Sequence, residues 1–265
     1  MPEIRVTITY VYIPSVESLG KGRNRSATSN GCVLSRLTKE ARADAAYEPS
    51  SSVGQATGWE VYSLAYPSTE QPLHLLAKGM AEEVRALAQP TQPVYAVTYS
   101  MGGVLLRHMM NLPQKGGINW QGCVMIAPPN QGSRTARIMS RVFLVRKIFR
   151  RRYGQAGMEL AAEIASRQVP WPDVPHPCGI IAGTRSFSWK SWISWLTTLF
   201  RILPGPADGT LLVEETRLEG AEAFTTIDCN HSLLPADPRI PLLVVQFLQH
   251  GTFDPSPNHG HEHAC

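Results

Sequence analysis

The chain has 265 residues, of which 43% are hydrophobic, so it is long enough for one substantial core and short for two independent domains. Its formal net charge of +4 is too mild to indicate nucleic-acid binding, and much of the excess lies between Arg134 and Arg152. The five cysteines stand far apart, with no CxxC pair and no metal-ligand spacing. We therefore expect reduced thiols, no metal and no nucleic-acid partner.

The sequence pattern of the N-terminal 58 residues differs from that of the rest of the chain. Residues 1–16 alternate polar with apolar residues, and no stretch of the chain approaches the apolar length of a membrane-spanning helix. We expect a cytoplasmic protein. Within residues 1–58 the pattern predicts a strand over Arg5–Ile13, a loop over Gly20–Gly31 and a helix over Val33–Ala46.

From Trp59 onward, short apolar runs alternate with segments of helical spacing, which is typical of βαβ units and a parallel sheet. The predicted strands are Glu60–Tyr66, Val94–Tyr99, Gly122–Ala127, Gly179–Gly183 and Ala223–Cys229. The predicted helices are Pro72–Ala88, a segment from Ser100 to about Asn111, and Ile240–Gln249. We expect an α/β core over residues 59–250, with a lid-like insertion at about 134–176 and a disordered tail over 251–265.

The strongest local signal is an apolar strand that runs into Ser100 and then directly into a helix. A serine at such a turn is a candidate nucleophile, because the strained backbone exposes its hydroxyl and requires small neighbours two residues away on either side. Gly102 meets this requirement, whereas Thr98 replaces the usual first glycine. The amide of Met101, at the start of the helix, can face a developing oxyanion. The alternative interpretation is an ordinary helix N-cap serine.

A nucleophilic serine needs a base and an acid that orients it. His231 follows a predicted parallel strand within two residues, at the sheet edge where such proteins build their sites. Asp208 lies in a Gly- and Pro-rich turn between the strands, although an Asp-Gly pair is also natural turn chemistry. Asp228 and Glu214 are rival acids.

Several motifs occur together in one order along the chain, and they resemble the small lipase- and esterase-like α/β hydrolases. The resemblance spans about Trp59 to Phe253. Its motifs are Thr98-Tyr-Ser-Met-Gly-Gly103, Ala127-Pro-Pro-Asn-Gln-Gly-Ser133, Ile181-Ala-Gly183, Pro204-Gly-Pro-Ala-Asp-Gly209, Val213-Glu-Glu-Thr-Arg217 and Asn230-His231.

This resemblance implies an α/β-hydrolase fold, with a mostly parallel sheet of about six strands, helices on both faces and a lid-like insertion. It implies hydrolysis of carboxylic esters with apolar or lipid-like acyl groups through an acyl-enzyme, with no metal or organic cofactor. It also implies Ser100 as nucleophile, Asp208 as acid and His231 as base. Tyr99, Met101, Asn130 and Gln131 are then expected to form the oxyanion site or to shape it.

One departure from the family concerns the second oxyanion donor. Such enzymes carry a Gly-containing turn after an early strand, whose amide completes the oxyanion hole. The candidate turns here are Ile13-Pro14-Ser15, Leu19-Gly20 and Asn30-Gly31, and none has the usual His-Gly. This departure and Thr98 motivate an alternative, a catalytically weak or dead hydrolase fold that serves as a binding module. An acyltransferase on the same triad is the nearest enzymatic alternative.

Two further segments bear on the substrate. Ile138–Tyr153 interleaves apolar residues with cations, which is typical of a basic amphipathic helix, and Arg141–Arg152 is a candidate contact with an anionic membrane. The alternative is a lid helix that packs its apolar face on the sheet. Trp189, Trp192 and Trp195 share one helical face, which we expect to be buried rather than to form an acyl-chain wall. His259, His261 and His263 fit a disordered His-rich tail better than a metal site.

Overall fold

A computed structural model gives the fold of most of the chain. The described residues are 9–14, 59–64, 66, 70–113, 117–142, 146–147, 149–150, 154–159, 161, 171–200 and 202–254. The predicted helix Val33–Ala46, the predicted loop Gly20–Gly31 and the three tail histidines lie outside these residues.

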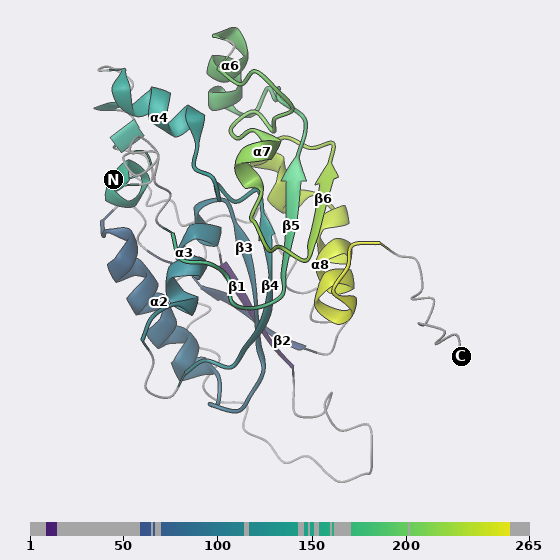
Figure 1. The fold of residues 1–265 in the computed structure, drawn as a ribbon. Helices are drawn as coiled ribbons and strands as arrows, with labels where there is room; N and C mark the ends of the chain where they lie inside the picture. The colour runs from purple at the N-terminus through teal and green to yellow at the C-terminus, as the bar shows by residue number, and fades with distance from the viewer. Residues whose placement is uncertain are drawn as a thin grey trace.

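A six-stranded sheet forms the centre of the molecule, in the order β2-β1-β3-β4-β5-β6 (Figure 1). Strands β3 to β6 are parallel, whereas β1 runs antiparallel to both β2 and β3. This confirms the predicted mostly parallel sheet of about six strands. The bounds are β1 Thr9–Pro14, β2 Trp59–Leu64, β3 Val94–Tyr99, β4 Trp120–Ile126, β5 Cys178–Gly183 and β6 Ala223–Ile227.

Alternation along the strands sends side chains to two separate cores. On β3, Val94 and Ala96 belong to the core beneath α2 (Leu73–Leu87) and α3 (Met101–Met110), while Val97 belongs to the core beneath α8 (Arg239–His250). The neighbouring strand repeats this division, with Met125 on the first side and Val124 on the second. Because successive strand residues point to opposite faces, helices cover both faces of the sheet, as predicted.

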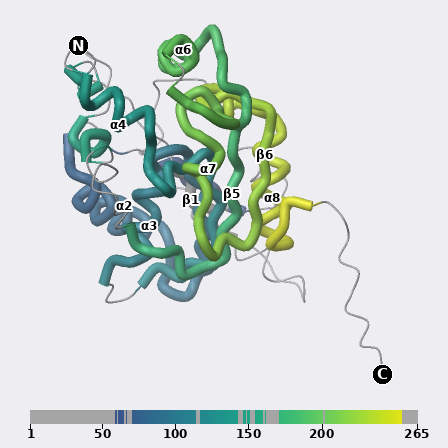
Figure 2. Tube along the Cα trace, turned by 45° about the horizontal axis from the view of Figure 1, so that its top comes forward, coloured from purple at the N-terminus to yellow at the C-terminus, as the bar shows by residue number. Residues whose placement is uncertain are grey.

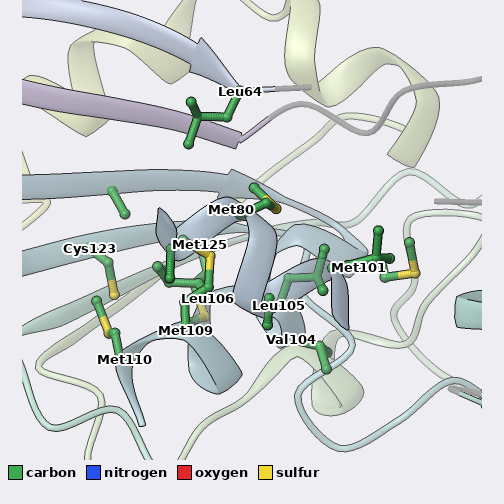
Figure 3. Close-up of a cluster of buried hydrophobic side chains, with 14 of the residues drawn as sticks. Leu64, Met80, Met101, Val104, Leu105, Leu106, Met109, Met110, Cys123 and Met125 are labelled. Atoms are coloured by element: carbon green, nitrogen blue, oxygen red, sulfur yellow. The ribbon is translucent and has the colours of Figure 1, made fainter. Parts of the chain in front are cut away.

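Helix α3 is buried almost all round. Nine of its ten residues are buried, and its side chains interleave with those of α2 and the sheet (Figure 3). Leu105, Leu106 and Met109 are fully buried there, against Met80 of α2 and Met125 of β4. A helix with no solvent face is held on all sides, so the residue at its first turn has a fixed position.

The segments after β4, β5 and β6 gather at the end of the sheet toward which the parallel strands point, as Figures 1 and 2 show. They contain α4 (Arg134–Arg141), α6 (Trp192–Leu199), α7 (Val213–Thr216) and the short 3-10 helix η2 (His231–Ala236). Parallel α/β sheets bind ligands at this carboxyl edge.

The predicted continuous helix over Ile138–Tyr153 is wrong. Helix α4 ends at Arg141, and Val142 turns to an extended conformation before helical backbone resumes at Arg146. Val142 is exposed, whereas Phe149 is buried in a small cluster with Met139. The described residues therefore do not form one continuous helix, because Val142 leaves the helical conformation.

The described start of the predicted tail packs against the core. Gly251 closes α8 in a left-handed conformation with a φ of 73°, and Phe253 stacks near Phe247 with a centroid distance of 5.2 Å. Residues 255–265 lie outside the described part of the chain. Across the described residues, no helix is long and apolar enough to span a membrane.

Candidate active site

Ser100 lies at the junction of β3 and α3, in a backbone conformation that few residues other than glycine adopt. Its φ is 53° and its ψ is −123°. Such conformations cost of order 1–3 kcal/mol and persist where the surroundings hold them. Here the amide of Ser100 donates a 2.8 Å hydrogen bond to the carbonyl of Ile126 on β4, and the buried helix α3 begins at the next residue. The turn presents the half-buried serine at the carboxyl edge of the sheet.

Gly103, in the first turn of α3, allows this helix to approach the loop after β4 closely. A Cβ on Gly103 would lie 2.8 Å from Cβ of Pro128, which is too close, whereas its 3.6 Å distance to Oγ1 of Thr98 would be an ordinary contact. Thr98, which replaces the usual first glycine, is buried.

His231 brings the serine and the aspartate together. Its Nε2 lies 3.1 Å from Oγ of Ser100, and its Nδ1 lies 2.6 Å from Oδ2 of Asp208. Both His231 and Asp208 are buried. The three side chains come from three separate crossings of the chain, and they converge in the Ser–His–Asp order expected for nucleophilic catalysis.

The turn that carries Asp208 is held from several directions. Oδ1 of Asp208 accepts hydrogen bonds from the amides of Thr210 and Leu211, at 2.9 and 2.7 Å. Its backbone carbonyl accepts from the amide of His231 at 2.8 Å and from Nδ2 of Asn230 at 2.7 Å. Oδ2 is thereby directed to the imidazole, and the acid and the base are tied to each other through backbone as well as side chains.

The rival acids lie elsewhere. Asp228 is exposed and pairs with Arg185 at 2.7 Å, which lowers the pKa of its carboxyl. Glu214 is exposed and pairs with Arg217 at 3.1 Å. Of the acids that the sequence offered as partners for His231, the structure brings only Asp208 to the ring.

Comparison with solved structures identifies the fold. The lipase BlEst2 of Bacillus licheniformis in its mature form matches with a TM-score of 0.56 at 15% identity, over 77% of this chain and 83% of that one. Its propeptide form matches with a TM-score of 0.57 at 13% identity, over 75% of this chain and 46% of that one. The chain has the α/β-hydrolase fold.

A hydrolase from Agrobacterium vitis S4, described as putative, matches at 12% identity over 76% of this chain and 79% of that one, with a TM-score of 0.48. No protein-family model and no curated protein sequence matches this α/β-hydrolase chain.

Tyr99 supports the base from behind. Its hydroxyl donates a 2.8 Å hydrogen bond to the carbonyl of His231, and its ring lies 5.1 Å from the imidazole, centroid to centroid. Tyr99 therefore contacts His231 through both its hydroxyl and its ring.

Asn130 and Gln131 anchor the loop after β4. Asn130 is buried, donates to the carbonyl of Thr216 at 3.0 Å and accepts from Nη1 of Arg107 at 3.2 Å. Gln131 is exposed and donates from its side chain to the carbonyl of Arg217 at 3.2 Å. The two residues fasten this loop to α7 and to Arg217 just after it.

Two buried charged residues escaped the sequence analysis. Arg107 is buried under the same loop and donates to the carbonyls of Trp171 and Pro172, at 3.0 and 2.7 Å. Glu215 is buried on α7 and accepts from the amides of Arg134, at the start of α4, and Leu212. Burial raises the pKa of Glu215, and these amide bonds oppose that rise. The signal for Arg107 was a lone cation in an otherwise apolar helix.

One candidate oxyanion donor, the amide of Met101, is found among the described residues. The amide of Met101 belongs to the first turn of α3, where amides have no intrahelical acceptor and the helix dipole favours negative charge. Of the three candidate donor turns, Ile13-Pro14-Ser15 begins away from Ser100, because β1 runs antiparallel to β3 and pairs Thr9 with Thr98 and Tyr12 with Tyr95. Pro14 thus ends β1 at the opposite edge of the sheet. The other two candidate turns lie outside the described residues.

The described part of the chain contains no set of metal ligands. Those residues contain no group of three or more His, Cys, Asp or Glu side chains arranged to hold an ion. Cys123, Cys178 and Cys229 are buried free thiols, and burial raises the pKa of Cys229 to about 11. A high thiol pKa keeps the sulfur protonated and unreactive.

The predicted burial of the tryptophan face of α6 is wrong. Trp189, Trp192 and Trp195 are exposed, and the helix instead buries Ser194 and Thr197. The cations of the predicted membrane-contact segment are also exposed where they are described, at Arg141, Arg146, Lys147 and Arg150.

Proposed function

We propose that this chain is a serine hydrolase that cleaves carboxylic esters with apolar or lipid-like acyl groups through an acyl-enzyme. One observation carries the proposal: Ser100, strained at the head of a buried helix, lies 3.1 Å from a histidine whose other ring nitrogen lies 2.6 Å from a buried aspartate. An ordinary N-cap serine requires neither the positive φ nor the imidazole, and the side chain of Ser100 makes no capping hydrogen bond to the helix.

In the acylation half-reaction, Oγ of Ser100 attacks the ester carbonyl carbon while its proton passes to Nε2 of His231. The carbonyl oxygen becomes an oxyanion that faces the amide of Met101. Asp208 accepts the Nδ1–H of His231, holding the tautomer and stabilising the imidazolium. As the tetrahedral intermediate collapses, the imidazolium protonates the leaving alkoxide and the C–O bond to the alcohol breaks.

In the deacylation half-reaction, a water molecule replaces the alcohol. His231 takes one proton from the water as its oxygen bonds to the acyl carbon, and then returns a proton to Oγ of Ser100 as the acid leaves. A second alcohol, amine or thiol in place of water would make the same site an acyltransferase, so the rate with water against a competing acceptor distinguishes the two.

An apolar acyl group is supported by the surroundings of the site. Helices α4 and α6 are joined above the carboxyl edge by a cluster that contains Met139, Phe149 and Ile202, with Leu196 packed against it. The likeness in fold to a lipase points the same way. The proposal requires no cofactor and no metal.

The test is hydrolysis of p-nitrophenyl esters from acetate to palmitate by the parent chain, by Ser100→Ala and by Ser63→Ala. Ser63 is an exposed serine on β2 and serves as the matched control. We expect activity in the parent and in Ser63→Ala, a loss of about 10³-fold or more in Ser100→Ala, and an optimum beyond acetate. Equal rates in all three proteins would contradict the proposal.

A second function is favoured by the direction of β1. Because Pro14, the last residue of β1, lies at the far end of the sheet, the amide of Met101 is the oxyanion donor that the described residues account for. The loss of one such donor costs about 10²- to 10³-fold in turnover. A folded parent chain without ester hydrolysis would therefore support a hydrolase fold that acts as a binding module.

A further inference from the structure

Helix α6 is turned with its polar face inward. Ser194 and Thr197 are buried, and their hydroxyls donate to the carbonyls of Ser188 and Gly209, at 2.9 and 2.8 Å. Ser191 caps the helix and accepts from the amide of Ser194. These bonds satisfy backbone carbonyls that the turn around Asp208 and the loop after β5 leave inside the protein. Leu196 packs against the cluster around Met139, so hydroxyls and one apolar side chain hold the helix while its other large apolar side chains stay outside.

The consequence is an exposed apolar surface, which we call the aromatic face. The exposed fractions of its side chains are 77% for Trp189, 38% for Trp192, 45% for Trp195, 75% for Leu199 and 66% for Phe200. Five of the eight large hydrophobic side chains that are exposed in the described part of the chain thus fall within twelve residues. Scattered apolar residues are ordinary on a surface, whereas a contiguous patch marks an interaction site.

The aromatic face is also preorganised. Trp189 and Trp195 meet edge to face with a centroid distance of 4.9 Å, and Phe187 contacts both rings at 5.1 and 5.6 Å. Rings that support one another lose little side-chain freedom on binding. Tryptophan is moreover enriched at membrane–water interfaces, because its ring is apolar and its N–H is polar.

Two stretches of the sequence around this face carry cations without acids. The sequence from residue 134 to 158 contains eight cations and no acid, and that from 174 to 207 contains three cations and no acid. Arg141, Arg146, Lys147 and Arg150, which we call the basic segment, are exposed. Helix α4, which ends at Arg141, and helix α6 both lie at the end of the sheet toward which the parallel strands point (Figures 1 and 2). The cluster that contains Met139 and Phe149, with Leu196 packed against it, links α6 to the stretch that carries the basic segment.

We propose that the aromatic face and the basic segment together form a docking surface for an anionic phospholipid bilayer. The aromatic face enters the interfacial region, while the cations lie among the lipid phosphates, where each adds attraction that decays within a Debye length. The orientation turns the carboxyl edge of the sheet, with Ser100, toward the lipid. The inference rests on the proposed function in one respect, namely that the bilayer would supply the ester substrate from its lipid phase.

The test measures vesicle binding in the Ser100→Ala background, so that hydrolysis cannot alter the lipid. Vesicles of phosphatidylcholine alone are compared with mixed vesicles of phosphatidylcholine and phosphatidylglycerol, by co-sedimentation at low and high salt. We expect binding to the mixed vesicles that weakens with salt. Leu199→Ser combined with Phe200→Ser should weaken it about tenfold or more, and Arg146→Glu combined with Lys147→Glu about tenfold or more.

Leu242→Ser is the matched control, because Leu242 is 73% exposed on α8, away from the proposed surface, and its loss should leave binding unchanged. Binding that is absent, equal on both vesicle types or equally weakened by Leu242→Ser overturns the proposal. So does a self-associated protein in sedimentation that Leu199→Ser converts to a monomer, since the aromatic face would then be an interface between copies. Hydrolysis of soluble p-nitrophenyl acetate is measured separately, so failure of the proposed function is seen without any vesicle.

Discussion

The hydroxyl of Thr197 on α6 donates a 2.8 Å hydrogen bond to the carbonyl of Gly209, the residue that follows Asp208. Both partners are buried, so this bond ties the helix that bears the exposed tryptophans to the turn that bears the proposed catalytic acid. The position of α6 and the position of Asp208 therefore depend on each other.

Removal of the Thr197 hydroxyl should disturb both. In Thr197→Val the Gly209 carbonyl loses this buried donor, and we expect a loss of about 1–3 kcal/mol in the free energy of unfolding, together with a fall in kcat on a soluble ester. Thr197→Ser keeps the hydroxyl and should retain more of both quantities. Urea unfolding and ester kinetics on the two variants provide the measurement, and a Val variant as stable and active as the parent would show that the bond is dispensable.

Gly209 itself should tolerate no side chain. Its φ is 90°, and a Cβ there would lie 2.3 Å from the carbonyl oxygen of Ser186 and 2.5 Å from Nδ2 of Asn230. Gly209→Ala should therefore destabilise the fold by about 1–3 kcal/mol through overpacking and by about 1–2 kcal/mol more through the left-handed backbone.

The control for this substitution is Gly205→Ala in the same loop, where the nearest atom to a Cβ is 3.8 Å away. Thermal unfolding should give a clearly lower Tm for Gly209→Ala than for Gly205→Ala. Equal stability in Gly209→Ala and Gly205→Ala would mean that the turn around Asp208 is looser than described.

Asp208→Asn should leave the fold intact and remove most of the activity. An amide cannot hold the imidazole in the tautomer that accepts the serine proton, and the same substitution in a Ser–His–Asp triad lowers kcat by about 10⁴-fold. Asp228→Asn is the matched control, since Asp228 is exposed and pairs with Arg185 outside the site. If instead Asp228→Asn were the inactive variant, the assignment of the acid would be wrong.

The sequence predicted the strands that lead into the site but not the orientation of everything around it. Val94–Tyr99 has the predicted bounds, because β-branched and aromatic residues alternate up to a serine whose geometry ends the strand. The direction of β1 was not predictable in this way, because an alternating pattern reads the same in both directions. The pairing of Thr9 with Thr98 and of Tyr12 with Tyr95 shows that the C-terminal end of β1 lies away from Ser100.

The exposed face of α6 escaped prediction for a different reason. Helical spacing groups the tryptophans correctly on one side, but it does not say which side is inside. That choice depends on the buried carbonyl of Gly209 and on the loop after β5, which need the hydroxyls of Thr197 and Ser194. A local sequence pattern does not show which distant backbone carbonyls need a hydrogen-bond donor.

Asp237 should make the stability of the protein depend on acidic pH. Its carboxylate accepts hydrogen bonds from the side chain and amide of Arg239 at the start of α8, and the Arg239 side chain lowers the pKa of Asp237 from 3.8 to about 2. A carboxyl with a depressed pKa in the folded state stabilises the fold at pH values above its unfolded pKa, and this contribution is lost as the pH falls toward the folded value.

The parent chain should accordingly be more stable than Asp237→Asn at neutral pH, and the difference should shrink between pH 3.8 and about 2. Urea unfolding of both proteins across this range measures it. A difference that stays constant with pH would mean that the Asp237 carboxyl contributes no charge-dependent stability.

The nucleophilic role of Ser100 is tested most directly by covalent labelling with a fluorophosphonate, followed by peptide mass spectrometry. The account predicts one label per chain, on Ser100, with release of fluoride, and no label on Ser100→Ala. Labelling should also fall sharply in Asp208→Asn, because His231 then cannot take up the serine proton. A folded parent chain that remains unlabelled, or a label that persists in Ser100→Ala, would contradict the account.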